Sequence, residues 1–153
     1  MATTRQARAI WNGELTKGKG TVSAISSRKF SDLPVSWAAR TEAPEGQTSP
    51  EELLAAAHAS CFAMALSAAL GRNKTPPEQL EVTATVTFDK VGDAWTVTKS
   101  ALDLRGNVPG IDAKTFDTFA QDAKDNCPIS RALKNNVSLS VSAKLSEASE
   151  SRA

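Results

Sequence analysis

The sequence is poor in the residues that most often carry chemistry: its 153 residues include one histidine, two cysteines and no tyrosine. Structural metal sites normally take four ligands from cysteine, histidine and carboxylates, so this supply is meagre. The glycine-rich motifs of nucleotide binding and the G-x-S-x-G motif of serine hydrolases are also absent. We therefore expect no cofactor and no metal, and any enzyme chemistry must come from side chains alone.

The chain also lacks a strong charge of one sign and a long apolar run. Its net charge is +1, with both signs interspersed, which argues against nucleic acid as a partner. No run approaches the roughly 18 apolar residues of a membrane span. The first residues, M-A-T-T-R-Q-A-R, lack the apolar core of a signal peptide. We expect a cytoplasmic protein without a membrane partner, and cysteine pairs in that compartment tend to be catalytic or redox-sensing.

Length and composition indicate an ordinary globular protein. The chain is 41% hydrophobic and 23% charged, and its length fits one domain with a sizeable core. We assign residues 1–146 to a single domain and residues 147–153 to a polar C-terminal tail.

A strong helix signal lies in the middle of the first half. Ser49 can cap the helix, and Glu52 three residues later completes a capping box. The helix should run from Pro50 to about Leu70, with Gly71 as its C-terminal stop, a length of roughly 31 Å. Beyond Glu52 it carries no charge. Because a helix that is apolar all round belongs in a large core or between subunits, we infer a homodimer with this helix at its centre.

The rest of the chain shows further strand and helix signals, which do not alternate regularly. Before the helix we expect three short strands, around Ala7–Trp11, from Val22 and over Val35–Arg40, with a loop over 17–20 and irregular chain over 41–48. After it we expect two long strands with a bulge near Leu102 and Leu104, a helix capped by Asp112, a short helix from Cys127-Pro128 through Lys134, and a strand over 137–145. This order indicates an α+β fold with mainly antiparallel strands.

The two cysteines have opposite surroundings. Cys61 lies in the apolar stretch A-A-A-H-A-S-C-F-A-M-A-L, whereas Cys127 lies at a helix start in D-N-C-P-I-S. A thiol in an apolar site resists ionisation, and a thiol at a helix N-terminus ionises more easily. The contrast suggests a redox pair with divided roles, and two inert buried cysteines are the rival interpretation.

A reactive Cys61 would need a cation nearby. His58 is one turn earlier on the same helix, and Arg40 ends the predicted third strand. Arginine is the better partner in a dry site because it stays charged, and Glu51 is the candidate carboxylate to pair with it. Taken singly, each of these residues also fits a structural role. His58 with both thiols could instead offer three metal ligands.

Helix geometry limits how Glu51 can act on Cys61. The two residues are ten positions apart, about 15 Å along one helix axis, although their directions differ by only about 80°. A carboxylate does not span that distance. Either Arg40 bridges it, or Glu51 reaches the thiol from the other subunit. We favour a site shared across a dimer interface.

Four segments together resemble the OsmC/Ohr family, most closely its osmotically inducible OsmC branch. The resemblance extends over nearly the whole chain, from about Ala9 to Leu145, and the two cysteine motifs are specific in combination. The segments are G-K-G-T-V-S (Gly18–Ser23), S-P-E-E-L-L-A-A-A-H-A-S-C-F-A-M-A-L (Ser49–Leu66), V-P-G-I-D-A-x-T-F (Val108–Phe116) and N-C-P-I-S (Asn126–Ser130).

The resemblance implies an intertwined homodimer and a thiol-dependent peroxidase that reduces organic hydroperoxides to alcohols. In it, Cys61 matches the peroxidatic cysteine, Cys127 the resolving cysteine, Glu51 the family glutamate and Arg40 the arginine of the OsmC branch. The Ohr branch carries its arginine in the first strands, where Arg8 and Lys19 compete with Arg40 in this chain.

The resemblance also implies a reductant and a role in oxidative or osmotic stress. The electron donor would be a dithiol, and relatives use dihydrolipoyl groups on proteins. A thiol redox sensor, or a small-molecule binding module without significant turnover, is the alternative function.

Overall fold

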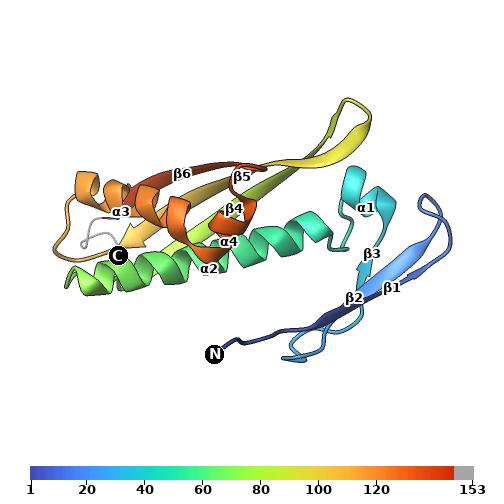
Figure 1. The fold of residues 1–153 in the computed structure, drawn as a ribbon, viewed down its shortest axis with the longest axis horizontal. Coiled ribbons are helices and arrows are strands. Elements are labelled where there is room, and N and C mark those ends of the chain that lie inside the picture. The colour runs from blue at the N-terminus through green and yellow to red at the C-terminus, as the bar shows by residue number, and fades with distance from the viewer. Residues whose placement is uncertain (147–153) are drawn as a thin grey trace. The chain divides into compact units, whose positions relative to one another are not determined.

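The structure, a computed structural model, describes residues 1–146, so the predicted tail at 147–153 lies outside the described residues. The chain forms two compact units, with the boundary after Leu53. Their strands and helices are labelled in Figure 1. The elements are β1 (Ala7–Asn12), β2 (Lys19–Ala24), β3 (Leu33–Val35), α1 (Trp37–Thr41), α2 (Pro50–Arg72), β4 (Gln79–Val91), β5 (Ala94–Asn107), α3 (Ala113–Asn126), α4 (Pro128–Leu133) and β6 (Ser138–Leu145).

Within the described residues, each unit has one three-stranded sheet, and the prediction of an α+β fold is confirmed. The N-terminal sheet has the order β1-β2-β3 and is antiparallel throughout. In the second sheet, β4 and β5 form a long antiparallel hairpin, and β6 joins β5 in parallel. Figure 1 shows α2 running along this second sheet, with α3 and α4 beside it.

The core of the C-terminal unit lies between its helices and its sheet. One face of α2 supplies Phe62, Leu66 and Leu70 at intervals of four residues, as a helix requires. Leu104 of β5 and Phe116 of α3 are buried against the same cluster. This packing fixes the middle of α2 and the start of α4 in one unit.

The predicted third strand is wrong over most of its length. The strand β3 ends at Val35, and Ser36 caps a short helix by accepting a hydrogen bond from the backbone N–H of Ala39 at 3.1 Å. Serine is a strong N-cap, and the alanines that follow favour helix over strand. Arg40 therefore lies on α1 rather than at a strand end. The predicted loop over 17–20 is also too long, because β2 begins at Lys19.

The long helix α2 begins as predicted but ends later. The side chain of Ser49 accepts a hydrogen bond from the backbone N–H of Glu52 at 3.1 Å. At the other end, Lys74 has a positive φ of 62°, its N–H donates to Gly71, and the N–H of Thr75 donates to Leu70. This is the Schellman arrangement, with Lys74 rather than Gly71 in the left-handed position.

The predicted bulge is present, but it lies earlier in β5 than expected. Thr87 pairs with Lys99, whereas the next residue, Phe88, pairs with Val97, so Thr98 is the extra residue. The insertion reverses which face of β5 is buried, and Leu102 and Leu104 then point into the core. The phase change visible in the sequence was thus real.

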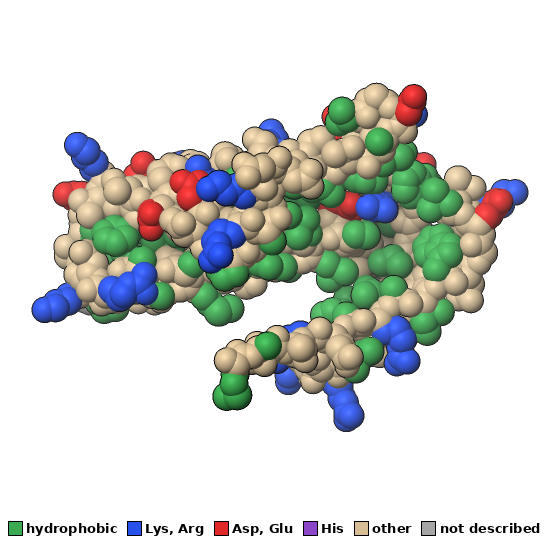
Figure 2. Space-filling view, in the orientation of Figure 1, with side chains coloured by type: hydrophobic (Ala, Val, Ile, Leu, Met, Phe, Trp, Pro, Cys, Tyr) green, Lys and Arg blue, Asp and Glu red, His purple; other side chains and the backbone are tan. Residues whose placement is uncertain are grey.

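The expectation about long apolar runs needs correction. In length and composition α2 could cross a membrane, although the core helix of a soluble protein meets the same criterion. Only 22% of its most apolar stretch is buried, and Met64 on its outer side is 70% exposed. The single chain therefore leaves much of this apolar helix uncovered. Figure 2 shows further hydrophobic side chains on the surface of the N-terminal unit, where Ile10, Trp11 and Leu15 are exposed.

Candidate functional site

The start of α4 brings the two cysteines of the sequence together. Cys127 lies between α3 and α4, where it ends one helix and caps the next. Pro128 at the first helical position holds the preceding residue in an extended conformation, which an N-cap requires. Cys61 lies in the middle of α2, and its Sγ accepts a hydrogen bond from the backbone N–H of Ile129 at 3.5 Å. Both cysteines are free thiols.

The surroundings of Cys61 oppose its ionisation. Burial raises the pKa of the Cys61 thiol, and the Ile129 N–H partly offsets this by lowering it. A hydrogen bond and an electrostatic interaction with Cys127 raise the pKa of Cys61 further. Cys61 also packs against the apolar core of this unit, as the sequence predicted. A thiolate at this position requires a further source of positive potential.

Cys127 is fully enclosed and bonded to Ser130. Only 1% of Cys127 is exposed. Its Sγ accepts a hydrogen bond from the Ser130 N–H at 3.4 Å, and its S–H donates to Ser130 Oγ at 3.0 Å. The sulfur thus fills the place that a serine or aspartate oxygen fills at most helix starts.

His58 is not the cation that Cys61 would need. Its imidazole is completely buried, with Nδ1 at 2.7 Å from Ser100 Oγ and Nε2 at 2.8 Å from Ser130 Oγ. Burial lowers the pKa of His58, so the ring is neutral at neutral pH. Both ring nitrogens of His58 thus bond to serines, and the hydrogen bond to Cys61 comes from the Ile129 N–H.

Arg40 and Glu51 form a bidentate ion pair in the N-terminal unit. Arg40 Nε lies 3.1 Å from both carboxylate oxygens, and Nη2 lies 2.8 Å from Oε1. Glu51 is 8% exposed, and the guanidinium carbon stands 5.9 Å from the ring centroid of Trp37. Two parallel charge-assisted bonds and an aromatic face hold the guanidinium in one orientation. The carboxylate partner proposed for Arg40 from the sequence is the one that it has.

Arg40 also borders an apolar pocket of about 280 Å³. The lining comes from β1 and its following loop, β3, α1 and the first residue of α2. It consists of Trp11, Leu15, Val35, Ser36, Trp37, Arg40 and Pro50. A charged donor at the edge of an apolar hollow is the arrangement that binds a ligand with one polar end.

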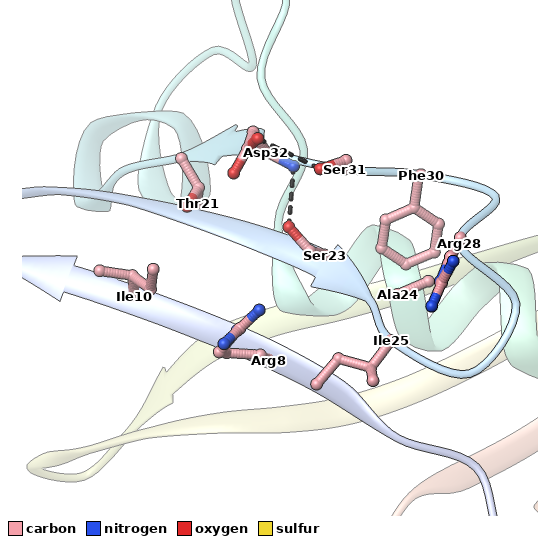
Figure 3. A pocket seen from close by; sticks show the side chains of 10 residues that line it. All are labelled: Arg8, Ile10, Thr21, Ser23, Ala24, Ile25, Arg28, Phe30, Ser31 and Asp32. Carbon is pink, nitrogen blue, oxygen red and sulfur yellow. Dashed lines mark hydrogen bonds between the residues drawn. The ribbon is translucent and has the colours of Figure 1, made fainter.

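The competing basic residues lie on the N-terminal sheet. Lys19 is exposed at the start of β2. Arg8 of β1 lines a separate pocket of about 510 Å³ together with Arg28 (Figure 3). The side of this pocket formed by Ser23 and Asp32 is held by the Asp32 N–H, which donates to Ser23 Oγ at 2.9 Å. Neither cysteine lines this larger pocket.

The sequence interpretation missed both serine partners of His58. Ser130 carried a usable signal, because it stands three residues after the cap residue Cys127, at the position whose N–H a cap accepts. Ser100 carried none, since its contact with His58 spans 42 residues of sequence. Within residues 1–146, no group of three or more histidine, cysteine or acidic side chains is placed to hold a metal ion.

Comparisons with known proteins give one consistent family. The model of the family described as OsmC-like protein matches residues 43–142. The chain is 44% identical to peroxiredoxin OsmC of Escherichia coli (strain K12) over 135 residues, which is 88% of this chain and 93% of that protein. It is 34% identical to organic hydroperoxide resistance protein-like 1 of Staphylococcus epidermidis over 65% of this chain and 71% of that protein.

Solved structures have the same fold. The crystal structure of an organic hydroperoxide resistance protein OsmC from Legionella pneumophila aligns with a TM-score of 0.71 and 23% identity, covering 94% of this chain and 98% of that chain. The structure of an OsmC-like protein from Mycoplasma pneumoniae aligns with a TM-score of 0.73 and 16% identity, covering 96% and 100%.

Proposed function

Because the chain belongs to the OsmC-like protein family, we propose that it is a thiol-dependent peroxidase that reduces organic hydroperoxides to alcohols. The names of its relatives, peroxiredoxin and organic hydroperoxide resistance protein, support a peroxide-related redox function and an oxidoreductase of the peroxidase type. One contact supports the cysteine mechanism most directly. The backbone N–H of Ile129 bonds to Cys61, and Cys127 stands two residues before it.

In this mechanism Cys61 is the peroxidatic thiol and Cys127 the resolving thiol. The Cys61 thiolate attacks the distal oxygen of ROOH, the O–O bond breaks, and the alkoxide leaves as an alcohol after taking a proton. Cys61 is then a sulfenic acid. Cys127 attacks this sulfur, water leaves, and a disulfide forms. A dithiol reductant, such as a lipoyl group on a protein, restores both thiols.

We propose that Arg40 supplies the positive potential for Cys61. The raised pKa of the Cys61 thiol creates the need for it. The guanidinium would stabilise the thiolate and the charge that develops on the leaving oxygen. Glu51 would hold Arg40 in its orientation through the observed bidentate pair. The test of the dimer also shows whether this pair acts on the Cys61 thiol of its own chain or on that of a second copy.

The apolar pocket beside Arg40 favours organic over hydrogen peroxide. Trp11, Leu15 and Val35 would cover an alkyl group while the guanidinium meets the peroxide end. Each buried CH₂ contributes about 0.8 kcal/mol. An alkyl hydroperoxide with a few carbons would therefore bind more tightly than hydrogen peroxide, which has no alkyl group to bury.

We further propose a cytoplasmic homodimer built around α2. The support is the exposed, uncharged side of this helix, which carries Ala56, Ser60, Met64 and Ala68. Met64 is its exposed large hydrophobic residue. A second copy of the same helix would cover that side with a surface of the same kind, as a two-fold interface does.

The test is a peroxidase assay that compares cumene hydroperoxide with hydrogen peroxide, with a dithiol reductant supplied. Wild type should turn over the organic substrate preferentially, and both Cys61→Ser and Cys127→Ser should lose turnover almost completely. Wild-type activity in Cys61→Ser would refute the mechanism. Reversible disulfide formation without turnover would instead favour a redox sensor.

A further inference from the structure

The hydrogen bonds around His58 can be ordered in one direction, from Cys127 through Ser130 to the imidazole. When the Cys127 S–H donates to Ser130 Oγ, the Ser130 hydroxyl proton is free to point at His58 Nε2. A neutral imidazole has one donor and one acceptor nitrogen, so Nδ1–H then donates to Ser100 Oγ. The result is an ordered path from the thiol through one hydroxyl to a base.

We propose that His58 and Ser130 form a proton relay that takes the thiol proton of Cys127 as this sulfur attacks the oxidised Cys61. The inference rests on the proposed peroxidase function and goes beyond it, because it assigns the proton acceptor of the resolving step. Ser130 touches the reacting sulfur, and His58 acts through Ser130 as a positioning residue that holds the transferred proton.

The step is balanced without an added oxidant. The S–S bond forms between Cys127 and Cys61 while the S–O bond of the sulfenic acid breaks. The thiol proton passes to Ser130 Oγ as the Ser130 proton passes to His58 Nε2. The oxygen leaves as hydroxide and takes a proton from solvent, and His58 returns its proton to solvent. The products are one disulfide and one water.

The burial of the group favours a chemical role over a packing role. His58, Ser100 and Ser130 are each 0% exposed, in a region whose remaining core is apolar. An apolar residue would fill the space of the imidazole without the cost of burying polar atoms. Within the described residues no buried side-chain nitrogen or oxygen lacks a hydrogen bond, so the network is complete.

The surroundings also suit a base rather than a cation. Among the described residues, the Cys127 thiol at the start of α4 bonds to Ser130, and Cys61 of α2 interacts with Cys127. From β5, the hydroxyl of Ser100 bonds to His58. Burial lowers the pKa of His58 and keeps the imidazole neutral at neutral pH, so one ring nitrogen is available to accept a proton. The relay reaches Cys127 alone, and therefore it should affect only the second chemical step.

The two steps can be separated in a single turnover. One equivalent of cumene hydroperoxide is added to the full-length reduced protein, and the Cys61 sulfenic acid is trapped with dimedone at successive times and quantified by mass spectrometry. Wild type, His58→Gln and Ser130→Ala are compared between pH 6 and pH 9. Ser130→Thr keeps the hydroxyl and serves as the rescue variant, and Ser138→Ala on the exposed start of β6 is the matched control.

We expect sulfenic acid to form at the wild-type rate in every variant. Disulfide closure in His58→Gln and Ser130→Ala should be slower at pH 7 by about 100-fold, the usual contribution of a general base. The deficit should shrink as pH rises, because hydroxide then removes the proton. Ser130→Thr and Ser138→Ala should close at close to the wild-type rate.

Three outcomes overturn the relay. The first is closure at the wild-type rate in both relay variants. The second is an equal slowing at every pH, which a displaced Cys127 would give. The third is a wild type that never forms a Cys61 sulfenic acid. The absence of a dimedone adduct identifies this outcome, which refutes the proposed function as well. Should His58→Gln fail to fold, Ser130→Ala alone decides.

Discussion

At the scale of single residues, the pair between Arg40 and Glu51 offers a direct test of thiol activation. Arg40→Lys keeps the charge but loses the two-bond geometry, and Glu51→Gln keeps the shape but loses the charge. A charge-assisted hydrogen bond is worth about 1.5–3 kcal/mol, so each change should lower kcat/KM by about 10- to 100-fold. Steady-state kinetics with cumene hydroperoxide measures this.

The matched comparison for that prediction is Arg8→Lys. Arg8 is the competing arginine of the first strands and lines a different pocket. Its substitution should leave kcat/KM within about twofold of wild type, since exposed residues away from a site have small effects. A large loss of kcat/KM in Arg8→Lys, with none in Arg40→Lys, would show that Arg8 rather than Arg40 activates the Cys61 thiol.

His58 should also make folding stability depend on pH. Its pKa is lowered in the folded state, so below pH about 6.5 the unfolded chain binds a proton that the folded chain does not. The free energy of unfolding is therefore highest above that pH and falls as pH drops toward the folded pKa. Urea unfolding between pH 5 and pH 7.5 should give this slope in wild type and a flatter one in His58→Gln.

The chain contains a single histidine, which makes the cause of that slope easy to verify. The imidazole C–H signal in a proton NMR titration belongs to His58 alone, and its midpoint should lie below pH 6.5. A midpoint at or above the value of a free histidine would contradict both the burial effect and the stability slope.

At the scale of elements, two glycines make a matched pair. Gly106 of β5 faces the ring of Phe116 in α3, and an added Cβ would collide with that ring. Gly71, in the last turn of α2, has open space at the same position. Gly106→Ala should destabilise by about 1–3 kcal/mol through overpacking, and Gly71→Ala should stabilise by up to about 1 kcal/mol through helix propensity.

Urea or thermal unfolding of the two variants measures that difference. The signs of the two effects are opposite although the chemical change is the same. Equal effects would mean that α3 does not pack against β5 through Phe116 as described.

The elements that the sequence predicted well are those with local signals. Ser49 and Asp112 cap α2 and α3 by accepting hydrogen bonds from backbone N–H groups three residues later. Such signals depend on a few adjacent residues of the sequence. The prediction of the third strand failed because Ser36 caps a helix that is too short to show a helical periodicity in the sequence. Apolar residues at Val35 and Trp37 fit either structure, and only the observed cap decides.

The candidate site was predictable in its residues more than in its contacts. The motifs singled out both cysteines as candidates. The need of an arginine in a dry site for a carboxylate predicted the pairing of Arg40 with Glu51, which is present. The bonds of His58 to Ser100 and Ser130 span 42 and 72 residues. Such contacts depend on how β5 and α4 pack against α2, and no local pattern encodes that packing.

At the scale of the whole molecule, the proposed homodimer would cover the exposed side of α2 with the same side of a second copy, as the two-fold symmetry of homo-oligomers favours. Met64 stands 70% exposed in the middle of this side. Burying a methionine contributes about 1.5–3 kcal/mol, and two-fold symmetry doubles the contribution. Met64→Glu would place two like charges in the same apolar contact.

Sedimentation velocity should therefore give a dimer for wild type and mainly monomer for Met64→Glu. Thr118→Glu, which adds the same charge on the exposed side of α3, should remain a dimer. If the catalytic site is shared between subunits, peroxidase activity should fall in step with the monomer fraction and recover at high protein concentration. A monomeric wild type would refute the interface. A monomeric but fully active Met64→Glu would show instead that Arg40 and Cys61 of one chain suffice.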